Sequence, residues 1–274
     1  MKKFTALLLA FILVIGLTAC GSGTGTGNGT GSGDTSTGGI SKSSQEFIDA
    51  LNAENAEEKG VCGADLTWYY KDNVLVIKGT GPMNDYYYDY PFIDPNTPWY
   101  DKGLKDKIHW LIIEEGVTSI GDGAFYGIGS LSKVEMPSTI ETIGDGAFRA
   151  TSSLKSIDIP SSVTEIGIYA FDCCESLSSI TIPDSVTKIG GGTFDRCKSL
   201  SSITIPSSVA EIDGALFDMC SSLSSIVFEG DAPEIEEYKW MFAGCELEQL
   251  TVTYSGSGFE PLIEAYPEIN WVKK

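Results

Sequence analysis

The sequence predicts a mostly β protein with short helical turns, built as a solenoid of 23-residue coils. The first observation is that phenylalanine recurs every 23 residues, and the second is that aliphatic residues fill three more columns at the same spacing. The third is that 42% of the residues are hydrophobic, which is enough for a packed core and too many for a disordered chain. The four columns are Phe125, Phe148, Phe171, Phe194 and Phe217; Ile120, Ile143, Ile166, Ile189 and Ile212; Val117, Ile140, Val163, Val186 and Val209; and Leu131, Leu154, Leu177, Leu200 and Leu223.

Each repeat unit predicts one coil of the solenoid. The unit is L-x-x-I-x-I-P-x-S-V-T-x-I-G-x-x-A-F-x-x-C-x-S, in which I-x-I predicts a short strand and the proline ends its pairing. The glycine predicts a tight turn, and A-F-x-x-C predicts a single helical turn. One unit buries too little apolar surface to fold alone, so we expect residues 111–252 to stack into a solenoid of five to six rungs.

The segments on both sides of the repeats are predicted to cap the open ends of the stack. In an N-terminal capping module, residues 61–110, the runs Leu66–Tyr70 and Val74–Lys78 predict a β-hairpin that covers the first coil. A C-terminal cap, residues 253–274, is expected to close the other end.

Residues 1–19 predict a lipoprotein signal peptide. Lys2 and Lys3 precede an apolar run of residues 6–17, which is shorter than the roughly 20 residues needed to span a bilayer. The run ends in Leu17-Thr18-Ala19-Cys20, which resembles the lipobox of bacterial lipoproteins. The resemblance implies that the thiol of Cys20 carries a diacylglyceryl group and anchors the protein to a bacterial membrane on its extracytoplasmic side.

Two further segments separate the anchor from the capping module. Residues 20–39 are rich in Gly, Ser and Thr and predict a flexible tether. Residues 40–60 hold a short amphipathic helix, expected from about Ser44 to Glu58, because Phe47, Ile48 and Leu51 share one helical face. The sequence leaves open whether this helix packs on the domain or stays loosely attached.

Residues 61–252 resemble the BspA-like leucine-rich-repeat proteins, which are surface proteins of anaerobic bacteria. The resemblance is carried by the 23-residue period, by the string I-P…V-T-x-I-G…A-F-x-x-C, and by Cys62-Gly63-Ala64-Asp65-Leu66-Thr67-Trp68 and Pro98-Trp99-Tyr100 before the repeats. It implies a leucine-rich-repeat solenoid at the cell surface and a role in adhesion to host proteins, other bacteria or extracellular matrix.

Composition and motifs argue against several functional classes. The chain has 38 acidic and 18 basic residues and a net charge of −20, so we expect no nucleic-acid partner. The sequence contains no G-x-S-x-G, G-x-G-x-x-G, G-x-x-x-x-G-K-[ST] or H-E-x-x-H motif. It therefore predicts a protein that is not an enzyme, with no catalytic residues, cofactor or metal site.

The cysteines other than Cys20 are predicted to be structural. Cys174, Cys197, Cys220 and Cys245 occupy one column of successive coils, where small buried thiols suit tight stacking. Disulfides between neighbouring coils or a metal site are the alternatives. Cys62 and Cys173 have no evident partner, and the sequence does not determine the redox state of any of these residues.

Two surfaces are candidates for binding. The first is the outward face of the predicted strands, which carries Lys133, Glu135, Ser156, Asp158, Ser179, Thr181, Ser202, Thr204 and Ser225. These polar side chains either bind an extended partner or only support the strands and their solubility. The second is the aromatic group Tyr86, Tyr87, Tyr88, Tyr90, Trp99 and Tyr100, which either binds glycans by stacking or covers the N-terminal end of the core.

These observations lead to one functional hypothesis with two alternatives. We expect a non-catalytic recognition or adhesion protein that presents a leucine-rich-repeat surface to proteins outside the cytoplasm. The first alternative is a glycan-binding lipoprotein that uses the aromatic group. The second is an envelope scaffold without a soluble ligand.

Overall fold

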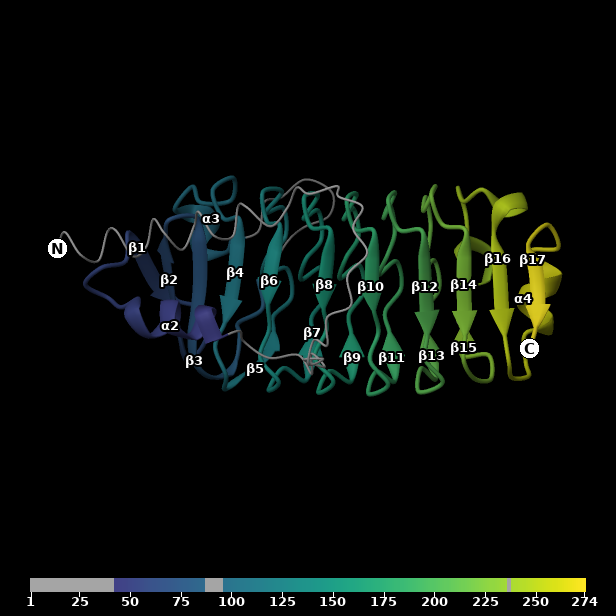
Figure 1. Cartoon of the computed structure of the whole chain (residues 1–274), viewed down its shortest axis with the longest axis horizontal. Helices are drawn as coiled ribbons and strands as arrows, with labels where there is room; N and C mark the ends of the chain where they lie inside the picture. The colour runs from purple at the N-terminus through teal and green to yellow at the C-terminus, as the bar shows by residue number, and fades with distance from the viewer. Residues whose placement is uncertain (1–41, 87–95, 236–237) are drawn as a thin grey trace, which may run out of the picture. The chain divides into compact units, whose positions relative to one another are not determined.

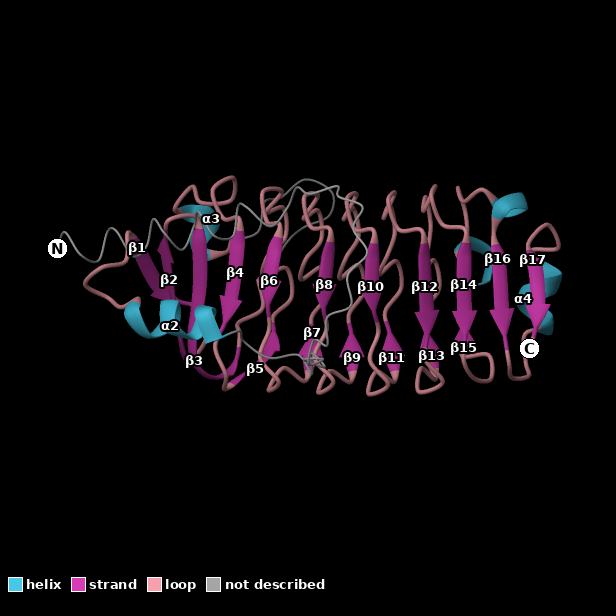
Figure 2. Cartoon of the chain, viewed as in Figure 1, coloured by secondary structure: helices cyan, strands magenta, loops and turns pink. Residues whose placement is uncertain are grey.

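The computed structural model of the chain describes residues 42–86, 96–235 and 238–274. The predicted signal peptide, the tether with Cys20, and three tyrosines of the aromatic group, Tyr87, Tyr88 and Tyr90, lie outside these residues. The described part is a stack of coils whose strands lie side by side along one axis (Figure 1). Most of its regular structure is strand, with few and short helices (Figure 2). The predicted fold class is therefore confirmed.

The N-terminal end of the stack is a small antiparallel unit. Strand β1 (Glu58–Val61) pairs with β2 (Asp65–Lys71), and β2 pairs with β3 (Val74–Pro82). Asp72 and Asn73 connect β2 to β3 with φ angles of 50° and 66°, values that a two-residue hairpin turn needs and that Asn and Asp tolerate. The predicted hairpin is present, and β3 continues into the repeats by pairing in parallel with their first strands, β4 and β5.

The first row of strands supplies one long strand to each coil. Its members are β4 (Trp110–Ile113), β6 (Lys133–Glu135), β8 (Ser156–Asp158), β10 (Ser179–Thr181), β12 (Ser202–Ile205), β14 (Ser225–Phe228), β16 (Thr251–Tyr254) and β17 (Asn270–Lys273). All the pairs within this row are parallel, and matching residues are one repeat apart from β4 to β14.

The second row consists of shorter strands that follow the first row in each coil. Its members are β5 (Val117–Ile120), β7 (Thr142–Ile143), β9 (Glu165–Ile166), β11 (Lys188–Ile189), β13 (Glu211–Ile212) and β15 (Glu234–Ile235). They form one continuous parallel ladder that begins on β3. Successive side chains of a strand point to opposite faces, so in each strand the isoleucine points into the core and the polar residue before it points outward.

The third side of each coil, which we call the turn arm, is formed by residues 123–127, 146–150, 169–173, 192–196, 215–219 and 240–244. The sequence predicts a helical turn here, and the structure has consecutive tight turns instead. The amides of Tyr169, Phe171 and Cys173 donate to carbonyls of the next coil at 2.8–3.0 Å, so the arm is hydrogen-bonded between coils. Positive φ angles at Tyr169 and Cys173 are incompatible with a right-handed helix.

A column of stacked aromatic rings runs through the core, which also contains the buried aliphatic residues of the repeats. Neighbouring phenylalanine rings from Phe125 to Phe242 have centroids 5.4–6.0 Å apart and interplanar angles of 1–22°. Trp99 stacks on the first ring at 5.3 Å, and Tyr266 packs edge-on against the last ring at 5.1 Å. The predicted alignment of phenylalanines from coil to coil is confirmed.

The glycine of each repeat has a different role from the one predicted. Gly144 and Gly167 do not adopt a positive φ, so the turn does not require glycine for its conformation. A Cβ at Gly167 would lie 2.6 Å from the carbonyl carbon of Gly144 in the preceding coil. The glycine column therefore allows consecutive coils to approach at van der Waals distance.

The remaining elements lie at the two ends. Helix α2 (Lys42–Ala50) is shorter than predicted, because the side chains of Asn52 and Asn55 accept hydrogen bonds from backbone amides and form a turn. Helix α3 (Pro98–Asp101) carries Trp99 into the core. Near the C-terminus, two 3-10 helices, η1 (Tyr238–Trp240) and η2 (Leu247–Gln249), precede helix α4 (Glu260–Ala265), which buries Leu262.

Candidate binding surface

The outward side chains of the first strand row form a continuous polar surface, which we call the strand face. Alternate residues of β8, β10 and β12 are exposed while the residues between them are buried. Register then aligns the exposed residues into columns along the stack, since Ser156 pairs with Ser179 and Ser202 pairs with Ser225. The structure thus brings the sequence-predicted residues together: Lys133, Ser156, Asp158, Ser179, Thr181, Ser202 and Thr204 are exposed, and Glu135 and Ser225 are half-buried.

Two hollows lie along the strand face. The larger, of about 640 Å³, spans β10, β12 and β14, and the smaller, of about 320 Å³, spans β6 and β8. Ser179, Thr181, Ser202 and Thr204 line the larger one with hydroxyl groups, and Glu229 adds a carboxylate. Each hollow coincides with a step where the strands of the described part form no β ladder, β6 to β8 and β10 to β12. Backbone groups at these steps are not committed to a ladder and can join the side chains in binding a partner.

The charged residues at the start of the strand face are held in place. Lys133 pairs with Glu135 at 2.6 Å, and its ammonium group lies 3.9 Å from the ring centroid of Trp110. Both contacts fix the Lys133 side chain against β4. At this end of the strand face the charges of Lys133 and Glu135 neutralise each other. The larger hollow, by contrast, is lined by the carboxylates of Asp184 and Glu229.

Helix α2 covers the N-terminal end of the strand face (Figure 1). Phe47 stacks on Trp110 with ring centroids 6.4 Å apart, and Trp110 and Ile112 are buried although both occupy outward positions of β4. The ammonium of Lys78 donates to the carbonyls of Ile48 and Leu51 at the end of the helix. The helix thus packs on the domain, which the sequence could not decide, and the open strand face begins at β6.

The aromatic group is divided between the core and the surface. Trp99 is fully buried between Trp68 and Phe125, and Tyr86 packs edge-on against it at 5.7 Å. Tyr100 is half-buried, and the ammonium of Lys105 lies 4.8 Å from its ring centroid. The rings of Tyr86 and Trp99 cover the end of the core and present no face on which a sugar could stack.

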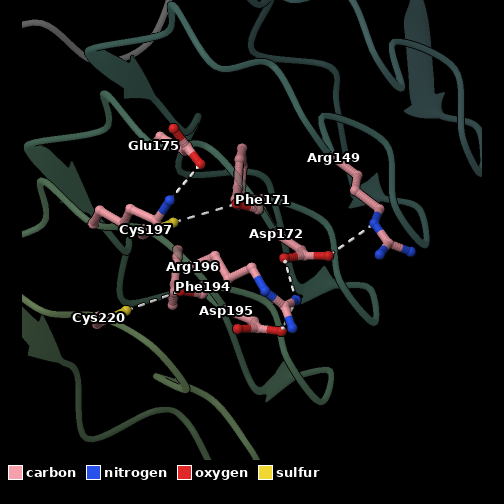
Figure 3. A network of polar contacts seen from close by, with 10 residues as sticks. Arg149, Phe171, Asp172, Glu175, Phe194, Asp195, Arg196, Cys197 and Cys220 are labelled. Carbon is pink, nitrogen blue, oxygen red and sulfur yellow. Dashed lines mark hydrogen bonds and ion pairs between the residues drawn. The ribbon is translucent and has the colours of Figure 1, made fainter. Parts of the chain in front are cut away.

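The column of cysteines forms a ladder of thiols that donate to carbonyls of the preceding coil. Cys197 donates to the carbonyl of Phe171 at 3.3 Å and Cys220 to that of Phe194 at 3.0 Å (Figure 3). Cys245 donates to the carbonyl of Phe217 at 3.1 Å. Burial raises the pKa of the Cys174 thiol to about 12, so it is an unreactive thiol at neutral pH. All six cysteines of the described residues are free thiols.

A charged network in the turn arm was missed in the sequence (Figure 3). Asp172 is fully buried, and its two oxygens face Arg149 at 2.8 Å and Arg196 at 3.5 Å. Arg196 also pairs with Asp195 at 2.6 Å. The signal was present, because Arg149, Asp172, Asp195 and Asp218 fall in one column of the 23-residue period.

Residues 42–86, 96–235 and 238–274 contain neither a helix that could span a membrane nor a group of side chains arranged to hold a metal ion. No helix there combines the length and apolar character needed to cross a bilayer. In the same part of the chain, no group of three or more His, Cys, Asp or Glu side chains is arranged to hold a metal ion.

Comparisons with known proteins identify the repeat. The sequence matches the family described as "BspA type Leucine rich repeat region" in six copies, over residues 104–213 and 142–260. No curated protein matches the chain.

Several solved structures are similar to the chain. A leucine-rich repeat protein of T. pallidum is 21% identical, covering 82% of this chain and 97% of its own, with a TM-score of 0.48. A leucine-rich cell surface protein of Faecalibacterium prausnitzii A2-165 is 18% identical, covering 81% and 96%, with a TM-score of 0.31. The pneumococcal vaccine antigen PcpA is 15% identical, covering 73% and 66%, with a TM-score of 0.42.

The family match spans more than half of the chain and falls on the coils that contain both strand rows and the phenylalanine stack. The resemblance stated from the sequence is therefore confirmed, and the chain belongs to the BspA-type leucine-rich repeat family.

Proposed function

We propose that this chain is a non-catalytic recognition protein of a bacterial cell surface, which binds partner proteins through its strand face. The single observation that carries the proposal is the exposed row of hydroxyl and charged side chains that follows the strands from β6 to β14. A repeat protein commonly uses such an extended surface for binding, because identical spacing of polar groups matches an extended partner. The family membership supports the same role.

The hollow across β10, β12 and β14 is the proposed centre of this surface. Its hydroxyl groups donate and accept hydrogen bonds, and its buried floor includes Ile180 and Ile203. A partner segment lying across the strands would exchange hydrogen bonds with the hydroxyls and exclude water from the floor. The absence of a ladder between β10 and β12 adds backbone groups to the same contact.

Charged blocking substitutions test the strand face. We expect Ser179→Arg with Ser202→Arg to weaken binding of a protein partner by about tenfold or more, because two long side chains would fill the hollow. Ser161→Arg with Ser222→Arg is the matched control, since both serines are exposed and lie outside the strand face. The protein without residues 1–20 would be screened against immobilised extracellular-matrix proteins and a glycan array, and both pairs of variants would be measured on each hit. Equal binding by the two pairs would contradict the proposal.

The same screens separate the alternatives. Binding to glycans alone would favour the aromatic group, and the Tyr87→Ala, Tyr88→Ala and Tyr90→Ala variant would then lose it. We exclude Tyr86 from this variant because its buried ring supports the core. An absence of hits on both screens would favour an envelope scaffold.

We further propose that the thiol of Cys20 carries the lipid that holds the protein to the membrane. The support is the sequence Leu17-Thr18-Ala19-Cys20 after a short apolar run. Two acyl chains give stable anchoring. Electrostatic attraction to anionic lipid could not provide it, because the protein is acidic. Expression with an alkyne-tagged fatty acid should label the wild type in the membrane fraction. Cys20→Ser should abolish the label, and a label that persists in this variant would refute the assignment.

A further inference from the structure

The turn arm concentrates large exposed side chains at backbone positions that favour glycine. Two columns of the arm have positive φ, and several coils place glycine there, at Gly123, Gly146 and Gly192 in one column and Gly127 and Gly244 in the other. The middle coils instead hold Tyr169, Arg196 and Met219 at φ angles of 56–57°. An L side chain at such a φ is strained, so retaining a large exposed one costs stability. Ala150, Cys173 and Ala215 share this backbone strain, but Tyr169 and Met219 add a large exposed side chain to it.

These side chains are fitted to the coil that follows them. A Cβ at Gly192 would lie 2.2 Å from the ring of Tyr169, and a Cβ at Gly244 would lie 2.6 Å from the sulfur of Met219. Each large residue thus extends along the stack onto a glycine of the next coil. The exposed fraction is 39% for Tyr169 and 49% for Met219, so both still offer much of their surface to solvent.

A network of ion pairs includes Arg196 and also contacts Tyr169. The guanidinium of Arg149 lies 5.2 Å from the ring centroid of Tyr169 and pairs with Asp172. Arg196 pairs with Asp195 and is hydrogen-bonded through its amide to the carbonyl of Asp218 in the next coil, at 2.8 Å. Tyr169, Arg196 and Met219 thus come from three consecutive coils, and these contacts hold Tyr169 and Arg196 in place on the stack.

The network contains three carboxyl groups and two guanidinium groups. Asp172 pairs with Arg149 and Arg196, and Asp195 pairs with Arg196, whereas no ion pair seen among the described residues includes Asp218. The Oδ1 atoms of Asp195 and Asp218 are buried without a hydrogen-bond partner, and Asp195 is only 6% exposed. Asp218 is half-buried and reaches the surface beside Met219. An added cation at this edge would pair with the Asp218 carboxylate.

We propose that this patch, consisting of Tyr169, Arg196, Asp218 and Met219, is a second recognition site that takes a basic side chain, Arg or Lys, of a partner protein. Asp218 accepts the cationic group, while Tyr169 and Met219 contact the apolar stem and neighbouring residues. Tyr, Arg and Met are enriched in protein interfaces, and the Ser- and Thr-rich strand face offers none of them between β8 and β12. The site differs from the strand face in position and chemistry, so it goes beyond the proposed function.

Glycine substitutions separate binding from folding at this site. Tyr169→Gly with Met219→Gly removes both exposed side chains, and glycine adopts the positive φ without strain. We therefore expect this double variant to melt at or above the temperature of the wild type. Ala215→Gly is the matched control, because Ala215 also has a positive φ, of 44°, but carries no large side chain. Asp218→Asn removes the charge and keeps the shape.

The probe is a random dodecapeptide library displayed on phage and panned against the protein without residues 1–20. We expect the recovered peptides to contain Arg or Lys beside apolar residues. Their binding should weaken by about tenfold or more in Tyr169→Gly/Met219→Gly and in Asp218→Asn, and should not change in Ala215→Gly or in the strand-face pair Ser179→Arg/Ser202→Arg. The glycine pair leaves the net charge unchanged, so its effect is distinct from general attraction of basic peptides to an acidic protein. Recovery of no peptide, of peptides without basic residues, or of peptides that bind the double variant as well as the wild type would overturn the proposal.

Discussion

At the scale of single residues, the structure places its least favourable positions in the turn arm. Non-glycine residues with positive φ, such as Tyr169 and Met219, cost roughly 1–2 kcal/mol each relative to ordinary backbone. Asp195 is a second unfavourable feature. Burial and, second, the nearby charge of Asp172 raise the pKa of its carboxyl to about 7, although Arg196 opposes the shift. Both features occur in the coils that carry the proposed second site.

The raised pKa of Asp195 makes stability depend on pH. Between about pH 4 and pH 7 the folded state binds this proton and the unfolded state does not, so the free energy of unfolding should fall as pH rises through this window. Urea unfolding at pH 5 and pH 8 measures the difference. Asp195→Asn cannot titrate and should reduce it. If the variant keeps the full pH dependence of the wild type, another group is responsible.

At the scale of the elements, the sequence predicted the strands well and the turn arm poorly. The I-x-I strands and the hairpin follow from alternation and turn residues, which are local signals. The turn arm was predicted as helical because A-F-x-x-C has helical spacing. Its conformation depends on hydrogen bonds such as that from the amide of Phe171 to the carbonyl of Thr193, one coil away, and such contacts leave no local pattern.

The close approach between coils predicts the effect of one methyl group. Gly167→Ala should destabilise the protein by about 2 kcal/mol or more, because its Cβ would collide with the backbone of the preceding coil. Gly129→Ala is the control, since its Cβ would meet only the hydroxyl of Ser152 at 3.3 Å. Thermal unfolding of the two variants compares them. Equal destabilisation would show that the close approach of the preceding coil is not what requires glycine at position 167.

At the scale of the whole molecule, the described stack behaves as a one-dimensional protein. Each coil contacts its neighbours, and the two ends are covered by Trp99 with the hairpin and by Tyr266 with α4. Strand β17 also pairs with β16, so the predicted C-terminal cap adds a further strand to the row as well as closing the core. Stability in such a stack depends on nearest-neighbour contacts.

Two phenylalanine substitutions test this arrangement. Phe171→Ala in the middle and Phe259→Ala in the C-terminal cap each remove a buried ring and should cost about 3–5 kcal/mol. We expect the first to lower protection from hydrogen exchange in coils on both sides. The second should lower it mainly in β16 and β17, because disruption spreads only through neighbouring coils. Uniform loss of protection in both variants would show that the stack unfolds as one unit.

The sequence by itself determined the period, the core columns, the polar residues of the strand face and the family, because each repeats as a local pattern at a fixed spacing. Only the tertiary structure decided that α2 covers the start of the strand face, that Tyr86 and Trp99 belong to the core, and that Arg149, Asp172, Asp195 and Arg196 form one network. These features depend on contacts between coils, where a side chain's surroundings come from residues about 23 positions away or more. Periodicity shows which residues align, but it does not show whether aligned charges meet solvent or each other.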